Sequence, residues 1–209
     1  STHCISSAAS DVYKRQAYFQ YDSKKTGGIT ISHLRFGKSP IKSTYFVNKA
    51  NFVACHNPSY IDKYDMVEDV VPGGSFLLNC QWTVDELDEK LPAPVKAYIA
   101  KNNINFYIIN AIKVAKDIGL GNKTNTVLQS AFFSIANIIP AEDAIEYMKK
   151  AAYKSFAKKG DDIVKMNYAA IEKGAGEVIK VDVPASWADA EGTPVSYTHL
   201  RAHETKANL

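Results

Sequence analysis

The sequence predicts a single α/β domain of three layers, in which a mostly parallel sheet is covered by helices on both faces. The chain has 209 residues, 46% of them hydrophobic, so it can bury one sizeable core, and disorder is excluded as its main state. Short apolar runs at 52–56, 75–79 and 104–110 alternate with helical stretches. Apolar strands joined by helices are typical of a parallel sheet that is buried on both faces.

The first two elements are predicted to be strands joined by a polar turn. Residues 17–22 (AYFQYD) are short and rich in aromatic side chains, and residues 29–36 (ITISHLRF) have the alternation of a strand. The turn at 23–28 contains two lysines and two glycines. The three apolar runs supply the next strands, and residues 178–183 alternate as a final one.

The remaining stretches are predicted to be helices and turns. We expect Ser59 to cap a helix over 60–70, and Pro72-Gly73-Gly74 to form a turn. Thr83 and Glu86 have the spacing of a capping box at a helix start. The further helices are expected over 111–118, 124–138, 141–159 and from 161 or 162 to about 173. The helix over 141–159 is the clearest, because acidic residues begin it and lysines end it before a glycine.

Composition excludes several classes of protein. The formal net charge is only +3, which is too small an excess to predict a nucleic-acid partner. The longest apolar runs fall far short of the ~18 residues of a membrane span, so we expect no membrane partner and a cytoplasmic location. Three cysteines without CxxC spacing predict neither a disulfide framework nor a metal site.

The two ends differ in character from the middle. Residues 1–16 (STHCISSAASDVYKRQ) have no helical or strand period and no apolar core of a signal peptide. Residues 195–209 follow a Gly-Thr-Pro break and carry two histidines without ligand spacing. Both segments are predicted to be non-native, artefactual ends, and residues 17–194 are expected to form the domain.

Most motifs favour structural roles. No GxGxxG fingerprint is present, and the glycines of such a loop are what let a backbone approach a pyrophosphate. The loop Gly119–Thr124 lacks the upstream glycine of a phosphate loop, so it is interpreted as a helix cap and turn. Cys55 and His56 are adjacent but lack an evident third catalytic partner. No catalytic residue is predicted from these patterns.

The hairpin of the first two strands carries the best candidate for a ligand site. Adjacent lysines, glycines that permit close backbone approach and an arginine could form a phosphate cradle. A flexible turn with a surface arginine is the alternative, and spacing alone weighs the two about equally. The candidate binding residues are Lys24, Lys25, Gly27, Gly28, Ser32 and Arg35.

The string YFQYDSKKTGGITISHLRFG (18–37) closely resembles the third domain of pyruvate:ferredoxin (flavodoxin) oxidoreductases. The resemblance continues through FVACHNPSYIDKYD (52–65), PGGSFLLN (72–79), IGLGNKTN (118–125) and VPASWA (183–188). It implies a gamma-type, Rossmann-like domain that is associated with coenzyme A and is truncated before its second strand, lacking its first strand and helix. Arg35, Pro40 and Ile41 resemble the arginine and Pro-Ile pair of gamma chains.

The resemblance also implies what the parent enzyme does. Such enzymes decarboxylate a 2-oxoacid on thiamine diphosphate with magnesium, pass electrons through [4Fe-4S] clusters to ferredoxin or flavodoxin, and form acyl-coenzyme A. Other domains of the parent, commonly a homodimer, are the implied partners. The thiamine diphosphate motif and the cluster cysteines are not found in this sequence, so the chain alone is expected to be inactive. There are two alternatives to a coenzyme-A-associated domain. One is an inter-domain packing module without a ligand, and the other is a flavodoxin-type nucleotide- or flavin-binding protein.

Overall fold

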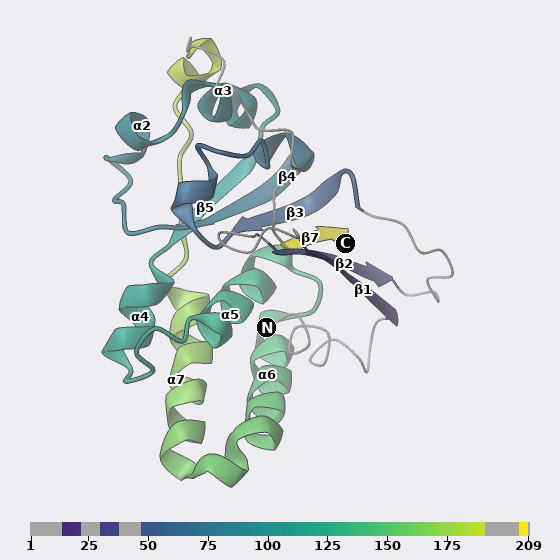
Figure 1. Cartoon of the computed structure of the whole chain (residues 1–209), viewed down its shortest axis with the longest axis vertical. Helices are drawn as coiled ribbons and strands as arrows, with labels where there is room; N and C mark the ends of the chain where they lie inside the picture. The colour runs from purple at the N-terminus through teal and green to yellow at the C-terminus, as the bar shows by residue number, and fades with distance from the viewer. Residues whose placement is uncertain (1–13, 22–29, 38–46, 191–204, 209) are drawn as a thin grey trace.

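The computed structural model describes residues 14–21, 30–37, 47–190 and 205–208, with side chains for 32–36 and 47–190. One seven-stranded sheet runs through the molecule in the order β1-β2-β7-β3-β4-β5-β6 (Figure 1). The strands are β1 (Lys14–Tyr21), β2 (Thr30–Gly37), β3 (Ala50–Cys55), β4 (Val70–Asn79), β5 (Asn105–Ile109), β6 (Ile179–Lys180) and β7 (Thr205–Asn208). The helices are α2 (Leu87–Lys90), α3 (Ala93–Lys101), α4 (Ala111–Asp117), α5 (Asn125–Ala136), α6 (Ala141–Phe156) and α7 (Asp161–Gly176). Among the described residues there are also four 3-10 helices: η1 (Pro58–Tyr60), η2 (Val67–Asp69), η3 (Ala157–Lys159) and η4 (Ala185–Asp189).

The centre of the sheet is parallel. β4 pairs in parallel with both β3 and β5, and β2 pairs in parallel with β7. Antiparallel pairing joins β1 to β2, β7 to β3 and β6 to β5. This arrangement confirms the predicted α/β class with a mostly parallel sheet.

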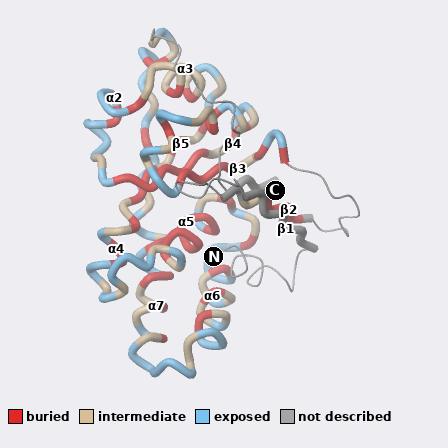
Figure 2. The backbone as a smooth tube through the Cα atoms, viewed as in Figure 1, coloured by how far each residue is buried: buried red, intermediate tan, exposed pale blue. Residues whose placement is uncertain are grey.

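Two apolar cores cover the two faces of the sheet, because successive side chains of each strand point to opposite sides. Phe52 and Ala54 of β3 pack with α4–α7, whereas Val53 and Cys55 pack on the side of α2, α3 and η4. Figure 1 shows these two groups of helices on opposite sides of the sheet, and Figure 2 shows the buried backbone concentrated in the sheet and in α5. The predicted three layers are confirmed.

The predicted turn at Pro72-Gly73-Gly74 is wrong, because these residues lie inside β4. The register between β3 and β4 shifts between Ala50 and Phe52, so the strand accommodates extra residues here. Gly73 has a left-handed φ of 77°, and a Cβ on Gly74 would meet the carbonyl oxygen of Asn51 at 2.9 Å. The glycines therefore form an irregularity within a strand, which the sequence alone does not distinguish from a turn.

The predicted helix over 60–70 is also wrong. The segment forms η1 and η2 with a turn between them, and the cap is Asn57, whose Oδ1 accepts a hydrogen bond from the amide of Ser59 at 3.1 Å. Five positions separate the buried Ile61 from the next buried residue, Met66, which breaks the spacing of three or four that a continuous helix face requires. Tyr98 of α3 instead holds the turn, donating from its hydroxyl to the carbonyl oxygen of Val70 at 2.8 Å.

Asp65 in this turn gives stability a pH dependence. Partial burial, followed by a hydrogen bond and charge repulsion from Glu68, raises the pKa of Asp65 to about 7. The folded state disfavours the ionised carboxylate. The contribution of Asp65 to the free energy of unfolding is therefore greatest below about pH 4, and it is lost as the pH rises through 7. We expect Asp65→Asn to raise the free energy of unfolding by about 1 kcal/mol at pH 8.5, after allowance for solvent screening, and to leave it unchanged at pH 4.

Urea denaturation at the two pH values measures this effect. The exposed neighbour Asp62 supplies the matched control, Asp62→Asn, which is expected to change stability equally little at both pH values. An Asp65→Asn protein that gains no stability at pH 8.5 relative to pH 4 would show that the carboxyl is not strained in the fold.

Two local signals in the sequence, one before α2 and one after α4, agree with the observed hydrogen bonds. The amide of Thr83 donates to Oε2 of Glu86 at 2.8 Å, which is half of a capping box before α2. The loop Gly119–Thr124 begins with a Schellman turn, in which Gly119 (φ 83°) and Leu120 donate to the carbonyl oxygens of Lys116 and Ala115 at 3.1 and 2.8 Å. The interpretation of that loop as a helix cap is confirmed.

Candidate functional site

The carboxyl ends of β3, β4 and β5 lie at one edge of the sheet, and each is followed by a polar segment. β3 leads into His56 and Asn57, β4 ends at Asn79, and β5 is followed by Asn110. In open α/β sheets this edge is where ligands bind, since the loops that leave parallel strands gather there. It is the first region of the fold to consider as a site.

Asn79 connects three parts of this edge. Its side chain is 7% exposed; Nδ2 donates to the carbonyl oxygen of His56 at 3.0 Å, and Oδ1 accepts from the amide of Ala111 at 3.0 Å. One side chain thus ties the end of β3 and the start of α4 to the end of β4. Asn79 was not predicted as a site residue, although an asparagine that ends an apolar run is a usable signal in the sequence.

The other asparagines of the edge cap helices. Oδ1 of Asn57 accepts from the amide of Ser59 at 3.1 Å, and Oδ1 of Asn110 accepts from the amide of Lys113 at 3.0 Å. These contacts satisfy helix-terminal amides that would otherwise lack a partner. His56 and Asn57 are exposed, so they present the accessible polar groups of this edge.

The two described cysteines have the environment of structural residues. Cys55 and Cys80 are buried, and their thiols donate to the carbonyl oxygens of Asn57 and Trp82 at 3.0 and 4.0 Å. Burial raises the pKa of the Cys80 thiol, which disfavours the reactive thiolate. This geometry agrees with the prediction that Cys55 has a structural role.

Four of the six predicted cradle residues, Lys24, Lys25, Gly27 and Gly28, lie outside the described residues. The hairpin residues that flank them, Tyr21 and Thr30, are paired with each other. Ser32 shares the partner Thr205 with Ala54 of β3. The Thr30 end of β2 is therefore level with the carboxyl end of β3. It lies at the same edge of the sheet as the carboxyl ends of β3, β4 and β5.

Ser32 and Arg35 are both described, and the structure does not bring them together. Leu34 and Phe36 pack in the core under α4–α7, and Ser32 has the same parity along β2. Arg35 has the opposite parity, is only 9% exposed, and lies three residues or about 10 Å further along the strand. Their side chains cannot contact one phosphate group together.

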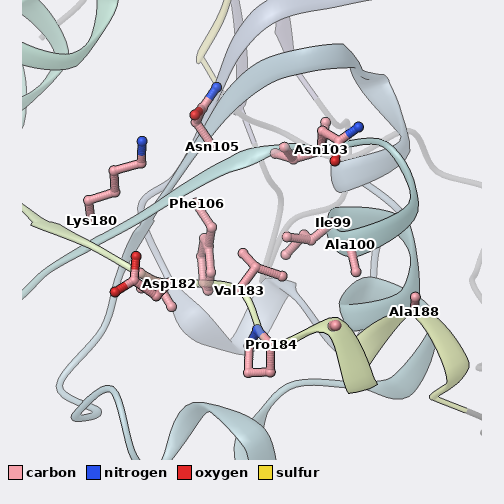
Figure 3. A pocket seen from close by; sticks show the side chains of 13 residues that line it. Ile99, Ala100, Asn103, Asn105, Phe106, Lys180, Asp182, Val183, Pro184 and Ala188 are labelled. Atoms are coloured by element: carbon pink, nitrogen blue, oxygen red, sulfur yellow. The ribbon is translucent and has the colours of Figure 1, made fainter.

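A cavity of about 510 Å³ lies at the opposite end of the sheet, beside the start of β5. Figure 3 shows the apolar side chains of Ile99, Phe106 and Val183 at its centre, with polar side chains around them. The polar residues are Asn103, Asn105, Lys180 and Asp182. Ile99 and Phe106 are fully buried, whereas Val183 is half-buried and Pro184 is exposed, so both polar and apolar groups of the lining are accessible. The cavity was not predicted from the sequence, because segments that are distant in the chain form it.

Two further observations concern the part of the chain that the structure describes. No helix in it is long and apolar enough to span a membrane. No group of three or more His, Cys, Asp or Glu side chains in it gathers as a set of metal ligands.

Solved structures of similar fold are gamma-type subunits of oxoacid oxidoreductases. The pyruvate oxidoreductase subunit PORC of Thermotoga maritima superposes with a TM-score of 0.67 at 18% identity, over 86% of this chain and 89% of the subunit. The gamma subunit of a keto/oxoacid ferredoxin oxidoreductase from Geobacter sulfurreducens gives 0.59 at 19% identity, over 84% and 85% of the two chains. At this identity the likeness defines the class of fold.

Sequence comparison gives the family. The family model for pyruvate ferredoxin/flavodoxin oxidoreductase matches residues 2–177. The chain is 51% identical over 180 residues to the pyruvate:ferredoxin oxidoreductase of Moorella thermoacetica, covering 86% of this chain and 15% of that protein. It is 50% identical over 192 residues to a pyruvate-flavodoxin oxidoreductase of Enterobacter agglomerans, covering 92% and 16%. The chain therefore belongs to the pyruvate ferredoxin/flavodoxin oxidoreductase family, which confirms the resemblance inferred from its sequence.

The chain spans about 15% of the length of these relatives. The family match begins at residue 2, within the segment 1–16 that is predicted to be non-native. The non-native origin of residues 1–16 and 195–209 stays a prediction.

Proposed function

We propose that this chain forms the coenzyme-A-associated domain of an enzyme that oxidatively decarboxylates pyruvate to acetyl-coenzyme A and reduces ferredoxin or flavodoxin. The observation that carries this proposal is the 51% identity to a relative named pyruvate:ferredoxin oxidoreductase. The proposed setting is a cytoplasmic enzyme, a homodimer as a whole, in which other domains of the parent surround this one.

In this proposal the chain binds and orients the acyl acceptor. Lys24 and Lys25 would offset the phosphate charge of coenzyme A, and Gly27 and Gly28 would let the backbone approach it closely. Either Ser32 or Arg35, which lie on opposite faces of the sheet, would add one further polar contact. Holding the thiol close to the acyl group accelerates transfer through proximity. The position of Thr30 and Ser32 supports this proposal. Both residues lie level with the carboxyl end of β3, at the edge where ligands bind in open α/β sheets.

The redox and decarboxylation chemistry belongs to other parts of the parent. A [4Fe-4S] cluster takes about four cysteine thiolates, whereas this chain has three cysteines. Cys55 and Cys80 are buried, and Cys4 is distant from both in the sequence. These residues do not fit a cluster. Thiamine diphosphate and magnesium are assigned to the parent on the family resemblance alone.

A second candidate, a packing module without a ligand of its own, has specific support. Both polar atoms of the Asn79 side chain already bond to backbone partners. Ser32 and Arg35 also lie on opposite faces of the sheet, so at most one of them can join a cradle on a given face.

Isothermal titration of the 209-residue chain with coenzyme A distinguishes the two candidates. If the cradle binds phosphate, replacing both Lys24 and Lys25 by alanine should weaken binding roughly 10- to 100-fold, as expected for loss of charge-assisted contacts. Arg35→Lys tests the guanidinium while keeping its charge. Lys123→Ala, an exposed lysine of the α4–α5 loop, is the matched control and should leave the affinity unchanged.

Two outcomes would count against the cradle. An unchanged affinity in the lysine variant would remove Lys24 and Lys25 from the site. No detectable binding to the unmodified chain would favour the packing module.

A further inference from the structure

After α7 the chain crosses from one face of the sheet to the other. α7 belongs to the apolar core of α4–α7, whereas η4 packs with α3 in the core on the opposite face (Figure 1). Residues 178–190 make this crossing around the edge of the sheet, since β6 is the last strand in the order of the sheet. We call residues 178–190 the strap.

The strap is held by few contacts. Within it only Val181 and Trp187 are buried, whereas Ile179 is 49% exposed. β6 pairs with β5 over two residues, and the amide of Val181 donates to the carbonyl oxygen of Phe106 at 2.9 Å. Nε1 of Trp187 donates to Oδ1 of Asp88 at 2.8 Å, and that carboxylate is mostly exposed. Two buried side chains and a few hydrogen bonds therefore order the whole segment.

The cavity of about 510 Å³ separates the strap from the rest of the protein. Strap residues between Lys180 and Ala188 form one wall, and the end of α3 with the start of β5 forms the other. Figure 3 shows Val183 of the strap beside Phe106 and Ile99 of the other wall. Protein cores leave few voids larger than a water molecule. The strap therefore lacks part of the packing that holds core segments together.

We propose that the strap opens as one cooperative unit while the sheet and the helices on both of its faces stay folded. Ordering a segment costs conformational entropy, and a segment with few buried contacts opens at a lower free energy than the whole protein. Opening uncovers Ile99 and Phe106 and leaves the edge of β5 unpaired. The strap thus controls access to an apolar surface and a strand edge. This proposal is independent of coenzyme A binding.

Native-state hydrogen exchange of the 209-residue chain tests this opening. The amide of Val181 reports on the strap, and the amides of Leu77 and Leu78, in the central strand β4, report on global unfolding. After correction for intrinsic rates, we expect the Val181 amide to exchange at least about 100-fold faster than those of β4. The exchange at Val181 should also depend little on urea, because opening of the strap exposes little surface.

A substitution in the opposite core separates the two kinds of opening. Phe132→Leu removes ring contacts to Phe36 and Phe52, and these contacts are present whether the strap is closed or open. It should therefore accelerate exchange at Leu77 by about 10-fold or more, as expected for a cavity in a core. Exchange at Val181 should stay almost unchanged, because the closed and the open strap lose the same contacts.

Substitutions in the strap should move the exchange rate of the Val181 amide in opposite directions. Trp187→Phe keeps an aromatic ring but removes the donor to Asp88, so it should accelerate this exchange at least about 3-fold. Ala188→Leu places apolar atoms in the cavity that Ala188 lines, so it should slow the exchange several-fold. Ala151→Leu, at a half-buried alanine of α6, is the matched control and should leave the rate unchanged.

Three results would overturn the proposal. The first is exchange at Val181 as slow as that at Leu77 and Leu78. The second is an acceleration of exchange at Val181 by Phe132→Leu that is as large as the one at Leu77, since the strap would then open only in global unfolding. The third is an unchanged rate at Val181 in both strap variants. Because none of these measurements involves coenzyme A, their failure leaves the proposed function to its own test.

Discussion

Replacing Gly174 by alanine is expected to destabilise the protein by about 2–3 kcal/mol, because α5 and α7 are in direct backbone contact at this glycine. A Cβ on Gly174 would lie 2.5 Å from the carbonyl oxygen of Val127 and 2.9 Å from Cβ of Ser130. Neither atom is the end of a flexible side chain, so the helices must separate to admit the methyl group. That strain exceeds the gain of about 1 kcal/mol that alanine brings over glycine inside a helix.

The same helix offers a matched control. Gly176, the last residue of α7, has open space around the position of a Cβ, so Gly176→Ala should be neutral or stabilising by a few tenths of a kcal/mol. Urea denaturation followed by circular dichroism compares the two variants. If Gly174→Ala and Gly176→Ala are equally stable, the close approach of α5 and α7 is wrong.

The contact at Gly174 belongs to a wider interface between these helices. Oγ1 of Thr126 donates to Oδ1 of Asn167 at 2.9 Å, and the hydroxyl of Ser130 donates to the carbonyl oxygen of Ile171. Hydrogen bonds of this kind require small residues that let two backbones approach. The helical period in the sequence predicts both helices, but it cannot show which of their glycines and serines meet.

The central strands were predictable for a physical reason. β3, the second half of β4 and β5 are covered on both faces, so their sequences are mostly apolar. Local signals failed where tertiary contacts decide. At 72–74 strand pairing overrides the turn tendency of Pro-Gly-Gly, and at 60–70 burial of Ile61, Met66 and Val67 overrides the helical tendency.

The candidate site was only partly predictable. Parity along β2 could have shown that Ser32 and Arg35 face opposite sides, because alternation within a strand is a local property. Asn57, Asn79 and Asn110 each follow an apolar run in the sequence, so their common location at one edge could also have been inferred. The partners of Asn79 could not, since His56 and Ala111 are 23 and 32 residues away.

Asn79→Ala is expected to destabilise the protein by about 2–4 kcal/mol, which is more than we expect for Asn110→Ala at the same edge of the sheet. The substitution leaves the amide of Ala111 and the carbonyl oxygen of His56 without their side-chain partner. Ala111 is fully buried, so water cannot replace the lost acceptor, and each unsatisfied buried group costs about 1–3 kcal/mol. Hydrogen exchange at the Ala111 amide should accelerate in parallel with the loss of global stability.

Asn110→Ala provides the comparison at the same edge. Asn110 is half-buried and makes one capping bond to Lys113, and loss of such a cap costs about 1 kcal/mol. Because β3, β4 and α4 all meet at Asn79, its loss should separate three elements, whereas loss of Asn110 should loosen one helix end. If Asn79→Ala loses no more stability than Asn110→Ala, the side chain of Asn79 does not hold the three elements together. Strand pairing alone would then hold this edge, and its loops would be free to move independently around any ligand that binds there.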